Sequence, residues 1–175
     1  MEQLIMVRKN LEGIPEAPLA AGYHIRFYAE GDDEKLAVVF QKCFDPGWSS
    51  DRVLKTFVEE SVWSPNRMCV LCHDDEVVGT ATAWELRQRP GHGMLHYLAV
   101  LPEHRGKGLG RALVARVLQL LKEMGYTDAW LSTDDFRLSA IRTYLALGFA
   151  PVCKDKSHAD RWEIVRHKLE ASSGG

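Results

Sequence analysis

Apolar residues along the chain follow two spacings, one typical of strands and the other of helices. Alternation with aromatic and β-branched residues predicts strands, whereas apolar residues three or four positions apart predict helices. The longest periodic stretch, residues 108–124, places Leu109, Leu113 and Val117 on one stripe and stops at Gly125. Strands are expected over residues 23–28, 68–72, 77–84, 94–100, 128–133 and 150–153, and helices over 31–44, 50–61, 108–124, 136–147 and a C-terminal segment with Trp162, Val165 and Leu169.

Both ends of the chain lack this periodicity. Residues 1–22 contain two prolines and two glycines and are predicted to form an irregular N-terminal arm. Residues 171–175, Ala-Ser-Ser-Gly-Gly, are expected to be a disordered tail. With 175 residues, 46% of them hydrophobic and 26% charged, the chain has the size and composition of one ordinary globular domain. We therefore expect a single domain over residues 23–170.

The central part of the chain reads as a strand, a glycine-rich turn, a helix and a second strand. This βαβ unit spans residues 94–133. Its two strands should be parallel and joined by a right-handed crossover. Residues 68–84 read instead as an antiparallel hairpin around a polar turn. Together these patterns predict an α/β fold.

The glycine-rich turn of this unit is the strongest candidate for chemistry. Gly106, Gly108 and Gly110 permit a tight turn and a close ligand approach. The helix that follows directs unpaired N–H groups and a positive dipole end toward an anion, and three basic side chains surround it. The spacing excludes both the P-loop and the dinucleotide fingerprint G-x-G-x-x-G. It predicts a phosphate or pyrophosphate site, with glycines used only for packing as the alternative.

Two motifs carry a family resemblance. The spacing Arg105-x-x-Gly108-x-Gly110 is similar to motif A of the GNAT N-acetyltransferase superfamily, and Ala140–Phe149 is similar to that family's A-x-x-x-Y-x-x-x-G-F ending. The resemblance covers residues 23–149. It implies a mixed, mostly antiparallel sheet, flanked by helices and splayed at a central parallel pair. It also implies acetyl-CoA as the acyl donor.

The resemblance assigns roles to individual residues. The backbone of Leu98, Ala99 and Val100 would pair with the pantetheine arm, and an N–H near Leu98 would act as the oxyanion donor. Tyr144 would be the general acid for the leaving sulfur. Packing of Tyr144 on an apolar helix face is the alternative. Arg137, where the family often has Asn, is a candidate for CoA contact. The pyrophosphate would be held by Arg105, Gly106, Lys107, Gly108, Leu109, Gly110 and Arg111.

The general base is less clearly marked. A common family position for a catalytic Glu is occupied by Met94, which cannot take a proton. His96 lies two residues further on the same strand face and suits the role by its ordinary pKa. Asp134 and Asp135 compete with it, although Asp135 is also placed to cap the next helix. The departures at Met94 and Arg137 leave a non-catalytic acyl-CoA-binding regulatory domain as the alternative.

The acceptor amine would enter between the first two helices and the loop before the central strand. A small primary amine, acetylated directly in a ternary complex, is the expected substrate. The candidate lining residues carry mixed charges and do not identify the amine. They are Asp45, Trp48, Asp51, Arg87, Arg89 and His92.

Composition limits the other partners. The net charge of −2 leaves no basic excess for nucleic acid or an anionic membrane. No apolar run is long enough to cross a bilayer and no signal peptide is evident, so a cytoplasmic protein is expected. Homodimers are common in the family, but nothing in this sequence shows one. Cys69-x-x-Cys72-His73 matches a haem-attachment pattern, yet a strand would place the two thiols on opposite faces, so buried free thiols and no metal are expected.

Overall fold

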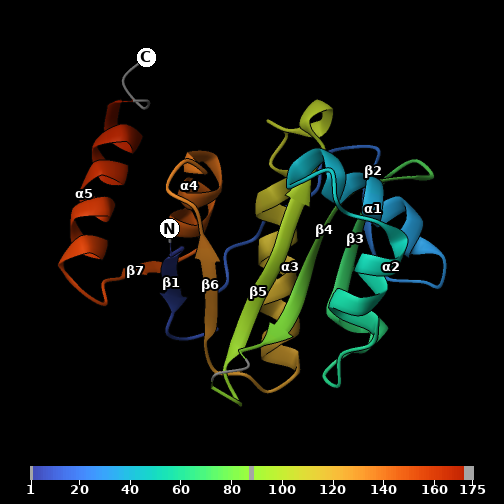
Figure 1. Ribbon diagram of the computed structural model, residues 1–175, viewed down its shortest axis with the longest axis horizontal. Helices are drawn as coiled ribbons and strands as arrows, with labels where there is room; N and C mark the ends of the chain where they lie inside the picture. The colour runs from blue at the N-terminus through green and yellow to red at the C-terminus, as the bar shows by residue number, and fades with distance from the viewer. Residues whose placement is uncertain (1, 87–88, 172–175) are drawn as a thin grey trace.

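The computed structural model describes residues 2–86 and 89–171. One seven-stranded sheet organises the chain, with strand order β2-β3-β4-β5-β6-β1-β7 (Figure 1). All neighbours pair antiparallel except β5 and β6, which are parallel. The strands are β1 Leu4–Arg8, β2 Tyr23–Phe27, β3 Met68–His73, β4 Glu76–Glu85, β5 Gly93–Val100, β6 Ala129–Thr133 and β7 Ala150–Val152.

Helices cover both faces of the sheet. In Figure 1, α1 and α2 lie in front of the strands β3–β5, and α3 lies behind them. The α3 stripe predicted from the sequence is buried against the sheet, with Leu113 and Val117 fully inaccessible. The predicted helix 50–61 is shorter and divided, because a π-helical turn, Leu54–Val58, follows α2 directly. The helices are α1 Asp32–Cys43, α2 Ser50–Val53, α3 Leu109–Glu123, α4 Leu138–Ala146 and α5 Lys156–Ala171, with 3-10 turns at Pro65–Arg67 and Pro102–His104.

The parallel pair is splayed, as expected. Strands β5 and β6 pair only through Gly93 with Ala129 and Met94 with Trp130, and they separate beyond these residues. Strand β5 keeps its other neighbour, since its pairing with β4 continues to Val100. The edge of β5 that faces β6 is therefore unpaired along most of its length. This leaves a V-shaped opening between the two strands, in which the candidate site lies.

The N-terminal arm is the main correction to the prediction. Leu4–Arg8 is not irregular but forms β1, which lies inside the sheet between β6 and β7. Leu4 and Met6 are fully buried and Ile5 is half-buried. An interior strand covered on both faces reads as a continuous apolar run instead of alternating, so the run Leu-Ile-Met-Val carried no strand period. Residues 9–22 have no regular helix or strand, as predicted.

The C-terminal part follows the sequence more closely. Ala150–Val152 is extended and forms the edge strand β7, and the predicted C-terminal helix is α5. Trp162 and Val165 are buried on it, and Leu169 packs against the core. The helix includes Ala171, and the remaining residues of the predicted tail, 172–175, lie outside the described residues. No helix in the described part of the chain is long and apolar enough to cross a membrane.

The cysteines of the C-x-x-C-H sequence are free thiols in the sheet interior. Cys69 is sensitive to the charge of Arg116 on α3, whereas Cys72 interacts with Arg26 and lies near α1, so the two thiols face opposite sides. Burial raises the pKa of the Cys69 thiol to about 12. Within residues 2–86 and 89–171, no group of three or more His, Cys, Asp or Glu is arranged to hold a metal ion.

Candidate active site

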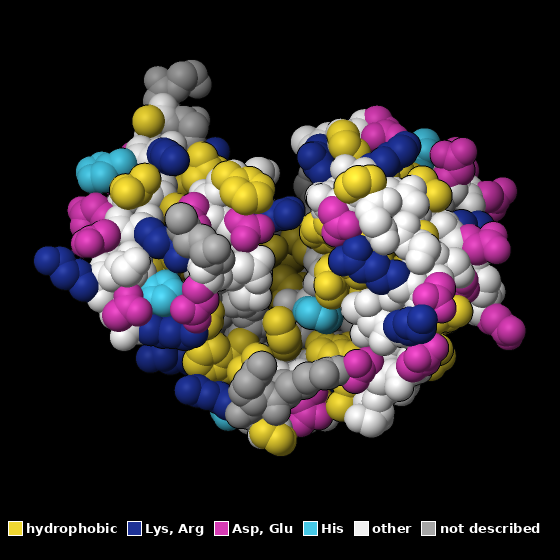
Figure 2. Space-filling model, viewed as in Figure 1, with side chains coloured by type: hydrophobic (Ala, Val, Ile, Leu, Met, Phe, Trp, Pro, Cys, Tyr) yellow, Lys and Arg dark blue, Asp and Glu magenta, His cyan; other side chains and the backbone are white. Residues whose placement is uncertain are grey.

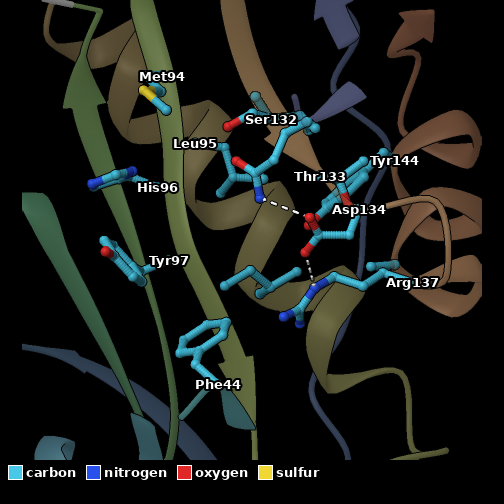
Figure 3. Close-up of a pocket in the computed structure, with 14 residues that line it drawn as sticks. Phe44, Met94, Leu95, His96, Tyr97, Ser132, Thr133, Asp134, Arg137 and Tyr144 are labelled. Carbon is cyan, nitrogen blue, oxygen red and sulfur yellow. Dashed lines mark hydrogen bonds and ion pairs between the residues drawn. The ribbon is translucent and has the colours of Figure 1, made fainter. Parts of the chain in front are cut away.

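A cavity of about 230 Å³ lies between the splayed strands. The space-filling view shows it as a cleft between the β1, β6, α4 and α5 side of the molecule and the β2–β5 side (Figure 2). In Figure 3, the β5 residues lie along one wall, and the β6 strand, the following loop and α4 form the other. The cavity is lined by Gln3, Phe44, Met94, Leu95, His96, Tyr97, Leu98, Leu131, Ser132, Thr133, Asp134, Arg137, Ala140 and Tyr144.

A bulge in β5 shapes the wall near the middle of the cavity. The β4–β5 register shifts between Thr80 and Thr82, and Tyr97 adopts a left-handed backbone conformation with φ of 47°. Consecutive side chains normally point to opposite faces of a strand. Here the rings of His96 and Tyr97 lie 4.4 Å apart, and both contact Phe57 on the α2 side. The bulge therefore presents two neighbouring side chains on the same face, as β-bulges near active sites often do.

The unpaired edge of β5 is partly satisfied by side chains. The Val100 carbonyl accepts a hydrogen bond from Arg105 Nε at 2.9 Å and another from Cys43 Sγ at 3.4 Å. Arg105 therefore folds back onto the strand that precedes it. Ala99, by contrast, is buried and pairs with Thr80 of β4. Of the three predicted pantetheine contacts, Leu98 lines the cavity, whereas Ala99 and Val100 do not.

The glycine-rich turn has the geometry of an anion site. Gly106 and Gly108 have φ of 79° and 74°, a region that side-chain-bearing residues avoid, so both glycines are required by the backbone. Gly110 lies in the first turn of α3 without a positive φ, and a Cβ there would meet open space. Within the described residues, no side chain caps the α3 N-terminus. A glycine that neither turn nor packing requires, beside uncapped N–H groups, fits a phosphate-bearing ligand at this point.

The basic residues of this turn are arranged around the same helix end. Lys107 Nζ lies 5.9 Å from the ring centre of Tyr23, and Arg111 is exposed in the first turn of α3. Leu109 is buried in the core and supplies only its backbone here. The turn thus offers backbone donors flanked by two exposed basic side chains.

Tyr144 occupies the opposite wall. Its side chain lies on α4, lines the cavity and is only 6% exposed. Burial raises the pKa of its hydroxyl to about 12, and the charge of Arg137 opposes part of that rise. Among the described residues, none forms a hydrogen bond with this hydroxyl. It therefore remains protonated at neutral pH and is available to a ligand.

His96 lies on the β5 wall at the base of an aromatic cluster. Its ring stacks on Trp84 with an interplanar angle of 26° and meets Phe57 edge-on. Met94 lines the cavity two residues earlier on the same strand. Both His96 and Tyr144 line the cavity, and Figure 3 shows them on different elements, His96 beside β5 and Tyr144 on the α4 side.

The two aspartates that compete with His96 are both engaged. Asp134 accepts a hydrogen bond from Gln3 Nε2 at 3.1 Å and one from Arg137 Nε at 2.9 Å (Figure 3). Asp135 is paired with Arg161 of α5, whose hydrogen bond lowers the pKa of that carboxyl. Asp135 does not cap the next helix, since the α4 N-cap is Arg137 without a side-chain cap.

Sequence reasoning missed part of the site. Gln3 comes from the strand taken for an irregular arm, and Phe44 from the end of α1. Tyr97 lines the cavity because of the bulge. No glycine or other turn residue at this point of the sequence predicts a bulge. Of the candidate acceptor residues, Trp48 is 2% exposed and packs in the core on Phe40. None of Asp45, Trp48, Asp51, Arg89 and His92 lines the cavity itself, and Arg87 lies outside the described residues.

Residues 34–149 match the model of the acetyltransferase (GNAT) family. That match covers well over half of the chain. The chain belongs to the GNAT acetyltransferase family. The family match includes α1, the splayed pair, the glycine-rich turn and α4, which are the elements that build the cleft.

Curated relatives agree with the family and extend beyond this chain. N-acetyltransferase 8B of Rattus norvegicus is 40% identical over 78 residues, which is 43% of this chain and 35% of that protein. Mycothiol acetyltransferase of Sanguibacter keddieii is 31% identical over 153 residues, covering 82% of this chain and 49% of that protein. The chain thus spans about a third to a half of the length of these relatives.

Solved structures share the fold. A GCN5-related N-acetyltransferase from Sphaerobacter thermophilus superposes with a TM-score of 0.71 at 23% identity, covering 87% of this chain and 50% of that one. The yncA protein of Salmonella typhimurium, solved with its cofactor acetyl-CoA, gives a TM-score of 0.62 at 21% identity, covering 75% and 82%.

Proposed function

We propose that this protein is an acetyl-CoA-dependent N-acetyltransferase that acetylates a primary amine directly, in a ternary complex. The observation that carries the proposal is the cavity between β5 and β6, which joins an unpaired strand edge to a protonated Tyr144. The turn after β5 leads to the N-terminus of α3, which has no side-chain cap among the described residues. Its first turn contains Gly110, where a Cβ would meet open space. Family membership and the fold relative solved with acetyl-CoA support the choice of donor.

The donor would bind along β5. Residues 106–111 would hold its pyrophosphate through backbone N–H groups, with Lys107 and Arg111 adding charge. The unpaired edge of β5 at Leu98 and Val100 would pair with the amide groups of the pantetheine arm, because unpaired backbone groups gain from such pairing. Arg105 must release the Val100 carbonyl when that carbonyl is used, and it is then free to reach a phosphate.

The chemistry needs few protein groups. Acetyl-CoA supplies an activated thioester: a carbon–nitrogen bond forms to the acetyl carbon as the carbon–sulfur bond breaks. His96 would take the proton that the amine nitrogen loses. Tyr144 would give its proton to the leaving sulfur. A backbone N–H near Leu98 would stabilise the negative charge on the carbonyl oxygen, and holding both reactants in place supplies much of the rate.

Burial matches the acid to the leaving group. A hydroxyl with a pKa of about 12 would be a weak acid toward a thiolate in water, where thiols have pKa values of about 8.5. Removal from water raises the proton affinity of a thiolate as well, and in this protein the buried Cys69 thiol also has a pKa of about 12. A leaving thiolate shielded from water in the cleft would gain proton affinity for the same reason, which favours proton transfer from Tyr144.

A second candidate function is a non-catalytic acyl-CoA-binding regulatory domain. The observation that favours it is Met94, which lines the cavity where a common family base would stand. This candidate keeps the anion site and has no acceptor chemistry.

Thiol release from acetyl-CoA, measured across a panel of primary amines beside thermal unfolding with CoA, distinguishes the two. Amine-dependent thiol release that depends on Tyr144 supports the transferase. A CoA-dependent rise in melting temperature without release from any amine favours the regulatory domain. Absence of any CoA effect on melting overturns both.

A further inference from the structure

Four side chains cluster where β5 and β6 still pair, at the closed end of the cleft. His92 Nδ1 lies 2.7 Å from Asp128 Oδ2, and the same oxygen accepts a hydrogen bond from Trp130 Nε1 at 2.9 Å. The guanidinium of Arg89 lies over the Trp130 ring, 5.1 Å from its centre. Asp128 is 9% exposed, so its carboxylate is a buried anchor for the other side chains.

This cluster continues the surface that lines the cavity. A Cβ on Gly93 would meet Leu121 of α3, so Gly93 faces that helix and its neighbours face the cleft. By strand alternation, positions 92, 94 and 96 share the cleft side of β5. Met94 pairs with Trp130, and Ser132 also lines the cavity, so the strip continues across β6. A ligand amine at His96 would therefore extend over Met94 and Trp130 toward His92.

The far end of this strip is rich in hydrogen-bond donors. Arg89 pairs with no carboxylate among the described residues, and its one side-chain contact is with Trp130. Two acids of this region already have partners, since Asp128 binds His92 and Trp130 and Glu85 accepts the Gly91 N–H at 2.7 Å. A guanidinium without a counter-charge, beside an imidazole fixed by a carboxylate, suits an anionic oxygen group, which arginine binds through two parallel hydrogen bonds.

We propose that the acceptor is an elongated primary amine that carries a carboxylate at its far end, bound by Arg89 and His92. The inference rests on the proposed function, because it takes the amine to lie at His96. Four residues of strand separate His96 from His92, a distance of about 13 Å. Hydrogen bonds of about 3 Å at the two ends shorten this distance by up to about 6 Å, so the nitrogen and the carboxylate of the acceptor stand about 7–10 Å apart. Its middle part is apolar enough to cover Met94 and Trp130.

Short alanine peptides test both the carboxylate of the acceptor and the distance between its amine and its carboxylate. An extended residue spans about 3.3–3.6 Å, so a tripeptide places its amine and carboxylate about 10 Å apart. We expect the free-acid tripeptide to exceed its C-terminal amide at least about tenfold in kcat/KM, a difference of about 1.4 kcal/mol. Alanine itself, one residue of about 3.5 Å, is too short to span this distance and should show no preference over its amide. The difference should lie mostly in KM for the peptide, since the carboxylate is remote from the reacting atoms.

Substitution of Arg89 then tests whether this residue causes the preference for the free acid over the amide. Arg89→Ala should reduce the ratio of free acid to amide to about one, and Arg89→Lys should restore part of it. Arg116→Ala is the matched control, because Arg116 also lies over a ring, that of Phe27, but on α3. This control should retain the full ratio. KM for acetyl-CoA should be the same in all three variants.

The outcomes separate this inference from the proposed function. Amine acetylation with equal rates for acids and amides, or an acid preference that survives Arg89→Ala, overturns the carboxylate site and leaves the transferase intact. Absence of thiol release from every amine overturns the proposed function and the acceptor site with it. Peptide binding to the CoA complex, followed by calorimetry, gives the same comparison of acid and amide without turnover.

Discussion

Replacing Tyr144 with Phe tests the proton donor directly. General acid catalysis contributes about 10²–10⁴-fold to a rate, which corresponds to about 2.7–5.4 kcal/mol of barrier. We therefore expect Tyr144→Phe to lower kcat at least about 100-fold. Because no described residue bonds to the Tyr144 hydroxyl, its removal leaves no orphaned partner. Stability should change by less than about 1 kcal/mol, a melting shift of no more than about 4 °C.

The assay is thiol release at saturating acetyl-CoA and amine, beside calorimetric CoA binding and thermal unfolding. Tyr126→Phe is the control, since that hydroxyl contacts Arg67 at 3.3 Å and the residue does not line the cavity. The pKa of about 12 also predicts that no loss of activity below about pH 10 arises from ionisation of Tyr144. A kcat within threefold of the parent would refute the role of Tyr144 as the acid. A drop in kcat with an equal drop in CoA affinity would instead indicate a binding role.

Three further changes test the anion site, the N-terminal strand and the charge network. Gly108→Ala should weaken CoA binding at least about tenfold in calorimetry, because Ala at φ of 74° is strained by about 1–2 kcal/mol. Gly125→Ala is the control: it introduces the same strain at φ of 88° near the end of α3 and should leave the CoA affinity unchanged. Arg8→Met should lower the free energy of unfolding, measured in urea, by about 3–5 kcal/mol. The reason is that the buried guanidinium donates hydrogen bonds to the carbonyls of residues 10, 12 and 147. A decrease of less than about 1 kcal/mol would contradict this. Asp32→Asn should destabilise the protein at pH 7, and the difference from the parent should shrink as the pH is lowered below about 3.9. Burial opposes ionisation of Asp32, yet hydrogen bonds from Arg26 and the Ala29 N–H lower its pKa overall. Its stabilisation is therefore present above the unfolded pKa and is lost as the pH falls through the folded value. A constant difference between the parent and Asp32→Asn across this pH range would show that the ion pair does not stabilise the fold.

Much of the fold could be predicted because its signals are local. The βαβ unit and the α3 stripe follow from apolar periodicity and two positive-φ glycines. The position of β1 could not be predicted, since its partners β6 and β7 lie far away in the sequence and its burial on both faces removes alternation. The division of residues 50–61 into α2 and a π-helical turn depends on packing against the sheet. Helix propensities of single residues do not include that packing.

The candidate site divides in the same way. The glycine-rich turn and Tyr144 belong to contiguous motifs, and both lie where their spacing indicated. Gln3 and Phe44 line the cavity from elements that are remote in the sequence, so no local pattern predicts them. The bulge at Tyr97 contains no glycine that would predict it. Arg105 shows a further limit, because its hydrogen bond to Val100 depends on a strand edge left unpaired by the splay.

The interior position of β1 also governs the order in which the molecule can assemble. Arg8 contacts the carbonyl of Leu147, 139 positions later in the chain, and β1 pairs with strands from the same late region. During synthesis, β1 therefore leaves the ribosome long before its partners β6 and β7, and it cannot pair until they have emerged. Such non-local pairing is slow and leaves a hydrophobic segment exposed meanwhile. The part of the sheet next to α4 and Tyr144 is therefore completed later than the hairpin of β3 and β4, and the cleft acquires its second wall only after β6, α4 and β7 have emerged.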